Sequence, residues 1–145
     1  MGRDKALLPH PSGGVWLTAL VDQLLPLGYP VQVLSRHREH AEVLGLRPGC
    51  SVLLEPPPWN GPLQALAKVL PPLPGEALLV LPVDMPHLRT AVFHQLIAAW
   101  NRAPEYAAVA HDGQRLQPLL AVIPSTSPFR SCLDQQLQRG ELRWM

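Results

Sequence analysis

The chain has 145 residues, a formal net charge of +1 and 16% charged residues, so neither a strongly basic nor a strongly acidic partner is indicated. Its length fits one domain with a substantial core. We recognise no signal peptide and no apolar run long enough to cross a bilayer, and we therefore expect a cytoplasmic protein without a membrane partner. The predicted strands carry few aromatic residues on which bases could stack, so we also expect no nucleic-acid partner.

In the first half of the chain, helical and strand patterns alternate. Glycines end two of the helices, and a proline sits in the first turn of the third. The predicted elements are a helix over 16–25 ended by Gly28, a strand over 31–35, a helix over 37–44 ended by Gly45, a strand over 51–54 and a helix over 62–69.

The second half continues this alternation and adds a hairpin signal, Asp112-Gly113. The predicted elements are a strand over 76–81, a helix over 90–100, strands over 106–110 and 119–123, and a helix over 127–139 closed by Gly140. The pattern predicts an α/β fold, a Rossmann-like three-layer α/β/α arrangement with a mostly parallel sheet and one antiparallel strand. Such sheets usually begin with a strand, whereas this chain begins with a helix, and we therefore expect that the first strand is missing.

Asp84 is the most informative candidate for function. It follows the apolar run over 78–81 and stands between Pro82 and Pro86. In an open α/β sheet, ligands bind outside the carboxyl ends of the strands, so an acid placed there is positioned for a metal ion or a polar ligand. The alternative is that Asp84 caps the next helix.

Two further segments could contact an anion. Lys5, with Arg3 beside it, lies ahead of the first helix and could neutralise phosphate; the alternative is a solvated chain terminus. The segment 60–63, Asn-Gly-Pro-Leu, opens a helix whose free amides could bind an anion or a base edge, with Gly61 allowing close approach. Plain helix initiation is the simpler interpretation.

The histidines give weaker signals. Arg36, His37, Arg38 and His40 form a basic run after a predicted strand, where an anionic ligand could sit, but a solvated helix face is the simpler interpretation. His94 lies on an apolar helix and is expected to be half-buried. We find no histidine spacing typical of a metal site and no recognisable Ser/His/Asp set.

In order, these pieces resemble the molybdenum cofactor guanylyltransferase family, within the nucleotidyltransferases of the glycosyltransferase-A type. The matching segments are 1–8 (Met-Gly-Arg-Asp-Lys-Ala-Leu-Leu), 61–63 (Gly-Pro-Leu) and 82–86 (Pro-Val-Asp-Met-Pro). The resemblance covers nearly the whole chain and implies a single nucleotidyltransferase-like domain over 1–145.

The resemblance also implies a reaction. The α-phosphorus of GTP is attacked by the terminal phosphate of molybdopterin, pyrophosphate leaves, and Mg²⁺ bridges the phosphates. Proteins of molybdoenzyme maturation are implied as partners. The implied catalytic residues are Lys5 and Asp84, with Asp84 as the metal ligand, and the implied nucleotide-binding residues are Arg3, Lys5, Ser35, Glu55, Gly61, Pro62, Leu63 and Asp84.

The chain departs from the family pattern at both ends. The family places a strand and Leu-x-Gly-Gly-x-Ser-x-Arg before the Met-Gly pair, which is Met1-Gly2 here, and continues beyond the last helix. We therefore expect a domain truncated at both ends, marginally stable and catalytically weak by itself. A cytidylyl- or sugar-phosphate nucleotidyltransferase of the same fold, or a non-catalytic remnant acting as a binding module, remains an alternative.

Overall fold

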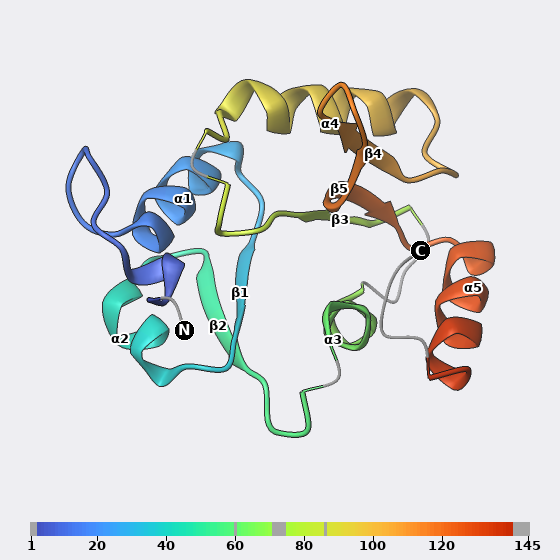
Figure 1. Cartoon of the computed structure of the whole chain (residues 1–145). Coiled ribbons are helices and arrows are strands. Elements are labelled where there is room, and N and C mark those ends of the chain that lie inside the picture. The colour runs from blue at the N-terminus through green and yellow to red at the C-terminus, as the bar shows by residue number, and fades with distance from the viewer. Residues whose placement is uncertain (1–2, 60, 71–74, 86, 141–145) are drawn as a thin grey trace. The chain divides into compact units, whose positions relative to one another are not determined.

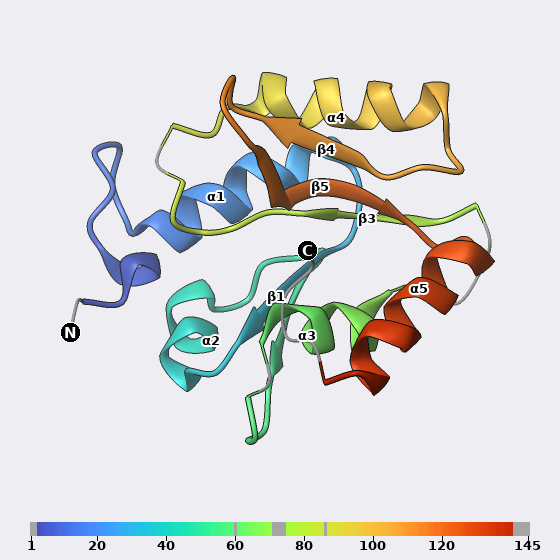
Figure 2. The ribbon, with the colours of Figure 1, turned by 45° about the vertical axis from the view of Figure 1, so that its right-hand side comes forward.

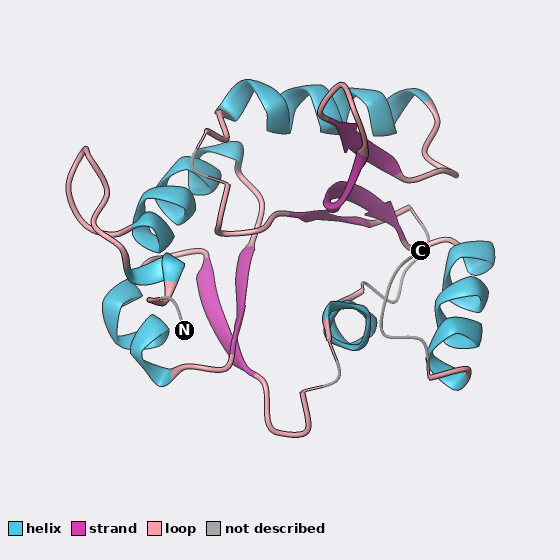
Figure 3. Ribbon diagram, in the orientation of Figure 1, coloured by secondary structure: helices cyan, strands magenta, loops and turns pink. Residues whose placement is uncertain are grey.

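The computed structural model describes residues 3–59, 61–70, 75–85 and 87–140. Of the motif residues, Met1, Gly2, Asn60 and Pro86 lie outside this range. The chain is a mixed α/β structure, as predicted (Figure 3). It divides into a first unit, Met1–Trp59 with Val83–Thr90, and a second unit, Asn60–Pro82 with Ala91–Met145.

The first unit contains a parallel pair of strands and the helices that pack against it. Its elements are the 3₁₀ turn η1 (Lys5–Leu7), α1 (Trp16–Leu24), η2 (Leu25–Leu27), β1 (Val31–Ser35), α2 (Arg38–Leu44) and β2 (Cys50–Leu54). β1 and β2 lie side by side, with Val31 opposite Cys50 and Ser35 opposite Leu54 (Figure 1). Gly28 ends the α1–η2 segment with a φ of 85°, a conformation that favours glycine.

The core of the first unit forms where η1, α1 and α2 meet one face of the β1–β2 pair. Its buried members are Ala6, Leu17, Val21 and Leu44. Alternate residues of the two strands pack against them, among them Val33 and Val52, as the two-residue period of a strand requires. Because Ala6 belongs to this core, the start of the described chain is anchored to it.

The second unit contains a three-stranded sheet in the order β3-β5-β4. Its elements are α3 (Pro62–Val69), β3 (Ala77–Val80), α4 (Thr90–Arg102), β4 (Ala108–His111), β5 (Leu116–Pro124) and α5 (Ser127–Gln138). β5 runs antiparallel to both of its neighbours, which confirms the predicted antiparallel strand on the C-terminal side.

Within the second unit, helices lie on both faces of this sheet. Figures 1 and 2 show α4 on one side of it and α3 with α5 on the other. Ala121 and Ile123 of β5 pack with leucines of α3 and α5, while Leu120 and Val122 alternate with them and are also buried. Phe93 is the most deeply buried residue of α4. This unit is thus a three-layer α/β/α arrangement.

Several details differ from the sequence-based expectations, including the bounds of both hairpin strands. β5 begins at Leu116, earlier than predicted, because the Asp112 carboxylate accepts hydrogen bonds from the backbone N–H groups of Gln114 and Arg115 and closes a tight turn. His94 is exposed instead of half-buried, since it lies on the solvent side of α4. In the described part of the chain, no helix is long and apolar enough to cross a membrane.

Candidate functional site

Lys5 and Asp84 meet on the surface of the first unit. Lys5 begins η1, and Asp84 follows the apolar segment that continues from β3. The Lys5 Nζ lies 3.4 Å from Asp84 Oδ2, and the two side chains are 67% and 49% exposed. An exposed ion pair of this kind contributes only about 0–1 kcal/mol to stability. Both groups are therefore accessible to a ligand. Lys5 could offer its positive charge to a phosphate, and Asp84 could offer its carboxylate to a metal ion.

The helix-cap alternative for Asp84 is wrong. α4 begins at Thr90, so the residue in the cap position is Arg89 and Asp84 lies further upstream. Among the described residues, no three His, Cys, Asp or Glu side chains form a group that could hold a metal ion. A single carboxylate suits Mg²⁺, which takes one or two protein carboxylates and completes its shell with water and substrate phosphates. The donor set at Asp84 therefore fits Mg²⁺ on a phosphate ligand.

Asp4, directly before Lys5, is turned inward. Its Oδ1 accepts a hydrogen bond from the Ala6 N–H at 3.0 Å, and its Oδ2 lies 2.7 Å from His40 Nε2. Burial raises the pKa of Asp4. The hydrogen bonds from His40 and the Ala6 amide lower it, as do the charges of His40 and His37, and together they hold the pKa below its ordinary value. Asp4 is therefore a carboxylate at neutral pH. Arg3, on the other side of Asp4, is exposed.

His40 continues this contact into the interior. Its Nδ1 lies 2.6 Å from Ser35 Oγ, and the Ser35 hydroxyl also accepts from the His37 N–H at 2.9 Å. His40 and Ser35 are 8% and 5% exposed. The expected solvated face is correct for Arg36, His37 and Arg38, which are exposed, and wrong for His40.

The expectation that the chain has no Ser/His/Asp set is wrong, because Ser35, His40 and Asp4 form one. Asp4 and His40 are 36 positions apart and come from η1 and α2, so no local spacing connects them. The one available signal was the periodicity of α2, which places His40 and Leu44, four residues apart, on the same buried face.

Ser35 and Glu55 lie at the carboxyl ends of the two parallel strands. The Glu55 N–H donates to the Ser35 carbonyl at 2.8 Å, which holds the two ends together. The Trp59 indole N–H donates to the Glu55 carbonyl at 3.0 Å, and the Arg36 guanidinium lies 5.3 Å from the centre of the Trp59 ring. Ser35 and Glu55 therefore lie at the sheet edge where ligands of α/β proteins bind.

Gly61, Pro62 and Leu63 belong to the second unit, where they begin α3. Gly61 precedes the helix with φ 91° and ψ 177°, a region of backbone space open almost only to glycine. Pro62 is exposed in the first turn. Leu63 is 2% exposed and packs in the core beside Leu66 and Ile123. The side chain of Leu63 therefore has a packing role, while the backbone of this segment stays a predicted contact for the nucleotide.

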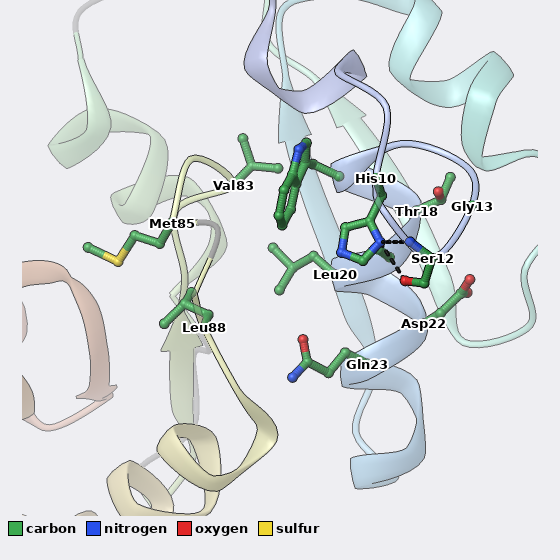
Figure 4. A pocket seen from close by; sticks show the side chains of 12 residues that line it. His10, Ser12, Gly13, Thr18, Leu20, Asp22, Gln23, Val83, Met85 and Leu88 are labelled. Carbon is green, nitrogen blue, oxygen red and sulfur yellow. Dashed lines mark hydrogen bonds between the residues drawn. The ribbon is translucent and has the colours of Figure 1, made fainter.

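A cavity of about 440 Å³ lies beside the Asp84 segment, within the first unit (Figure 4). Val83 and Met85, the two neighbours of Asp84, contribute to its wall opposite α1, but neither Lys5 nor Asp84 lines it. His10 Nδ1 accepts a hydrogen bond from the Ser12 N–H at 3.1 Å and lies 2.6 Å from Ser12 Oγ. The His10 and Trp16 rings pack edge to face, with their centres 4.4 Å apart. The sequence did not indicate this cavity.

The mixed α/β fold is consistent with a nucleotidyltransferase. The chain belongs to the family described as MobA-like NTP transferase domain, which it matches over residues 1–145. This confirms the resemblance found in the sequence motifs.

Several relatives carry more specific names. The chain is 35% identical to a probable molybdenum cofactor guanylyltransferase of Rhodopirellula baltica, over 92% of this chain and 64% of that protein. It is 29% identical to the molybdenum cofactor guanylyltransferase of Pseudomonas syringae pv. syringae, over 97% and 67% of the two chains. A probable molybdenum cofactor guanylyltransferase of a Nostoc species is 33% identical, over 95% of this chain and 64% of that protein. The chain thus spans about two thirds of the length of these relatives.

Proposed function

We propose that this chain carries the nucleotide-binding part of a guanylyltransferase that transfers GMP from GTP to molybdopterin with Mg²⁺ and releases pyrophosphate. The observation that carries the proposal is the accessible pair of Lys5 Nζ and Asp84 Oδ2, 3.4 Å apart, within a nucleotidyltransferase family domain. The names of the relatives from Rhodopirellula and Pseudomonas support the choice of GTP and molybdopterin.

The chemistry requires charge neutralisation more than a strong base. An oxygen of the acceptor's terminal phosphate forms a bond to the α-phosphorus of GTP, and the bond from that phosphorus to the bridging oxygen of pyrophosphate breaks. Mg²⁺, when bound, would offset the charge that develops on the leaving group. In this proposal Asp84 supplies the protein's carboxylate ligand, and Lys5, assisted by Arg3, contacts the phosphate oxygens.

The remaining predicted residues would recognise the nucleoside. Gly61, Pro62 and Leu63 would line the base and ribose through their backbone, since the Leu63 side chain is in the core. Glu55, half-buried at the end of β2, has a carboxylate that can accept hydrogen bonds from an N–H edge such as that of guanine. A preference for CTP or UTP would indicate the cytidylyl- or sugar-phosphate alternative.

The test is transfer of label from α-³²P-GTP to molybdopterin in the presence of Mg²⁺. Label in a dinucleotide product, with equimolar pyrophosphate, supports the proposal. Parallel assays with CTP and UTP identify the base. Mg²⁺-dependent nucleotide binding without any product would favour a binding module, and absence of both binding and product would contradict the proposed function.

A further inference from the structure

Lys5 is the exposed end of a chain of contacts that begins in the interior of the first unit. Ser35 Oγ lies 2.6 Å from His40 Nδ1, His40 Nε2 lies 2.7 Å from Asp4 Oδ2, and Asp4 Oδ1 accepts from the Ala6 N–H at 3.0 Å. We propose that His40, held by Ser35, is a positioning residue that fixes Lys5 beside Asp84 by binding Asp4. The proposal rests on the proposed function insofar as it requires Lys5 to contact nucleotide phosphates.

The geometry explains how contacts on either side of Lys5 fix it without covering it. Before Lys5, the Asp4 carboxylate binds His40. After it, Ala6 is 2% exposed and packs with Leu17 and Val21. The Lys5 side chain itself is 67% exposed. The turn is therefore anchored at both ends while the ammonium group stays free for a ligand.

The link from His40 to Asp4 is compatible with both protonation states of the imidazole. A carboxylate only accepts, so His40 Nε2–H donates to Asp4 in either state. In the neutral ring Nδ1 accepts from the Ser35 hydroxyl. In the charged ring Nδ1–H donates to Ser35 Oγ, and the hydroxyl hydrogen turns to the His37 carbonyl, 3.1 Å away. No partner is left unsatisfied in either case.

A Ser–His–Asp set also occurs in hydrolases, but this one lacks the required access. Ser35 is 5% exposed, and its hydroxyl is surrounded by the His37 N–H, the His37 carbonyl and His40. A nucleophile must reach its substrate, so the arrangement suits an internal anchor. The Ser35 side chain, predicted to contact the nucleotide, would then act on the site through His40 and Asp4.

Two substitutions of His40 separate its two contacts. In His40→Gln, the side-chain amide nitrogen can reach the place of Nε2 and donate to Asp4. In His40→Asn, the shorter amide can take the place of Nδ1 beside Ser35 but cannot reach Asp4. Leu44→Ala is the control for general loss of stability, because Leu44 is buried in the same core and lies outside the contact chain.

The experiment measures amide hydrogen exchange at residues 5–8 and the kcat and KM of GMP transfer from Mg·GTP to molybdopterin. We expect His40→Asn to speed exchange at these amides and to lower kcat by about tenfold or more, the usual effect of losing a hydrogen bond to a charged group. His40→Gln should have nearly wild-type amide exchange and kcat. Leu44→Ala should lower the melting temperature but keep its kcat at temperatures where the protein is folded.

Equal behaviour of His40→Asn and His40→Gln, or wild-type exchange in His40→Asn, would overturn the proposal. Equal loss of kcat in His40→Asn and Leu44→Ala at matched stability would do so too. If the wild-type protein transfers no nucleotide, the proposed function fails, and the exchange difference between the Asn and Gln variants still decides whether His40 holds the Lys5 turn.

Discussion

Lys5 Nζ lies 3.4 Å from Asp84 Oδ2, although the two residues are 79 positions apart in the chain. One belongs to the turn before α1 and the other to the segment after β3, and both are in the first unit. The fold thus brings the two charged residues of separate motifs to one accessible place. An exposed pair of this kind adds little stability, so both side chains could exchange their mutual contact for contacts with a charged ligand at little cost.

Replacing Lys5 by Ala should weaken binding of Mg·GTP by about 10- to 100-fold, since a hydrogen bond to a charged group is lost. The melting temperature should stay the same, because the side chain is exposed. Calorimetric titration and thermal unfolding measure the two effects. Lys68→Ala is the matched control, an exposed lysine in the last turn of α3. Equal losses of affinity in the two variants would contradict a specific role for Lys5.

Leu63→Ala should cost about 2–5 kcal/mol of unfolding free energy, as expected for a buried leucine. Leu63 is 2% exposed, whereas Leu116, at the start of β5, is 48% exposed and gives the control Leu116→Ala. Urea unfolding measures both. If Leu63→Ala proves as stable as Leu116→Ala yet binds GTP poorly, the side chain faces the ligand and the packing role assigned here is wrong.

The hairpin between β4 and β5 should lose stability in acid. Hydrogen bonds from the backbone amides of Arg115 and Gln114 lower the pKa of Asp112 from 3.8 to about 2. A group with a depressed folded pKa stabilises the fold above its unfolded pKa, and this contribution disappears as the pH falls from near 4 to near 2. Carboxyl NMR titration should show the low pKa.

The control for this titration is Asp112→Asn, which cannot ionise but keeps an oxygen that accepts from the turn amides. Its thermal stability should change less than that of the wild type over the same pH range. A wild-type Asp112 that titrates near 3.8 would show that the turn does not stabilise the charged form.

Local patterns predicted most of the elements. β1 and α3 have the bounds expected from the sequence. Gly28 and Pro30 mark the residues before β1, and Pro62 marks the start of α3. The hairpin was located by Asp112-Gly113, but its strands were placed inaccurately because the turn depends on side-chain hydrogen bonds of Asp112. Patterns of hydrophobicity contain no information on such bonds.

The candidate site was only partly predictable. Lys5 and Asp84 were singled out from their motifs, yet their proximity depends on the tertiary structure. His40 was assigned to a solvated face because its neighbours are charged, and its pairing with Asp4, 36 positions away, depends on the tertiary structure. Likewise, the cavity lined by His10 and Met85 lies between α1 and the segment after β3. These two parts of the chain are far apart in sequence, so no local pattern predicts the cavity.

The metal-binding role proposed for Asp84 is tested by the Mg²⁺ dependence of GTP binding in wild type and Asp84→Asn. The control is Asp134→Asn, at an exposed position on α5. Asparagine keeps the size of the side chain and removes the charge that a metal ion requires. We expect Mg²⁺ to strengthen GTP binding to the wild type and the control but not to Asp84→Asn, with all three proteins equally stable. Unchanged Mg²⁺ dependence in Asp84→Asn would contradict this role.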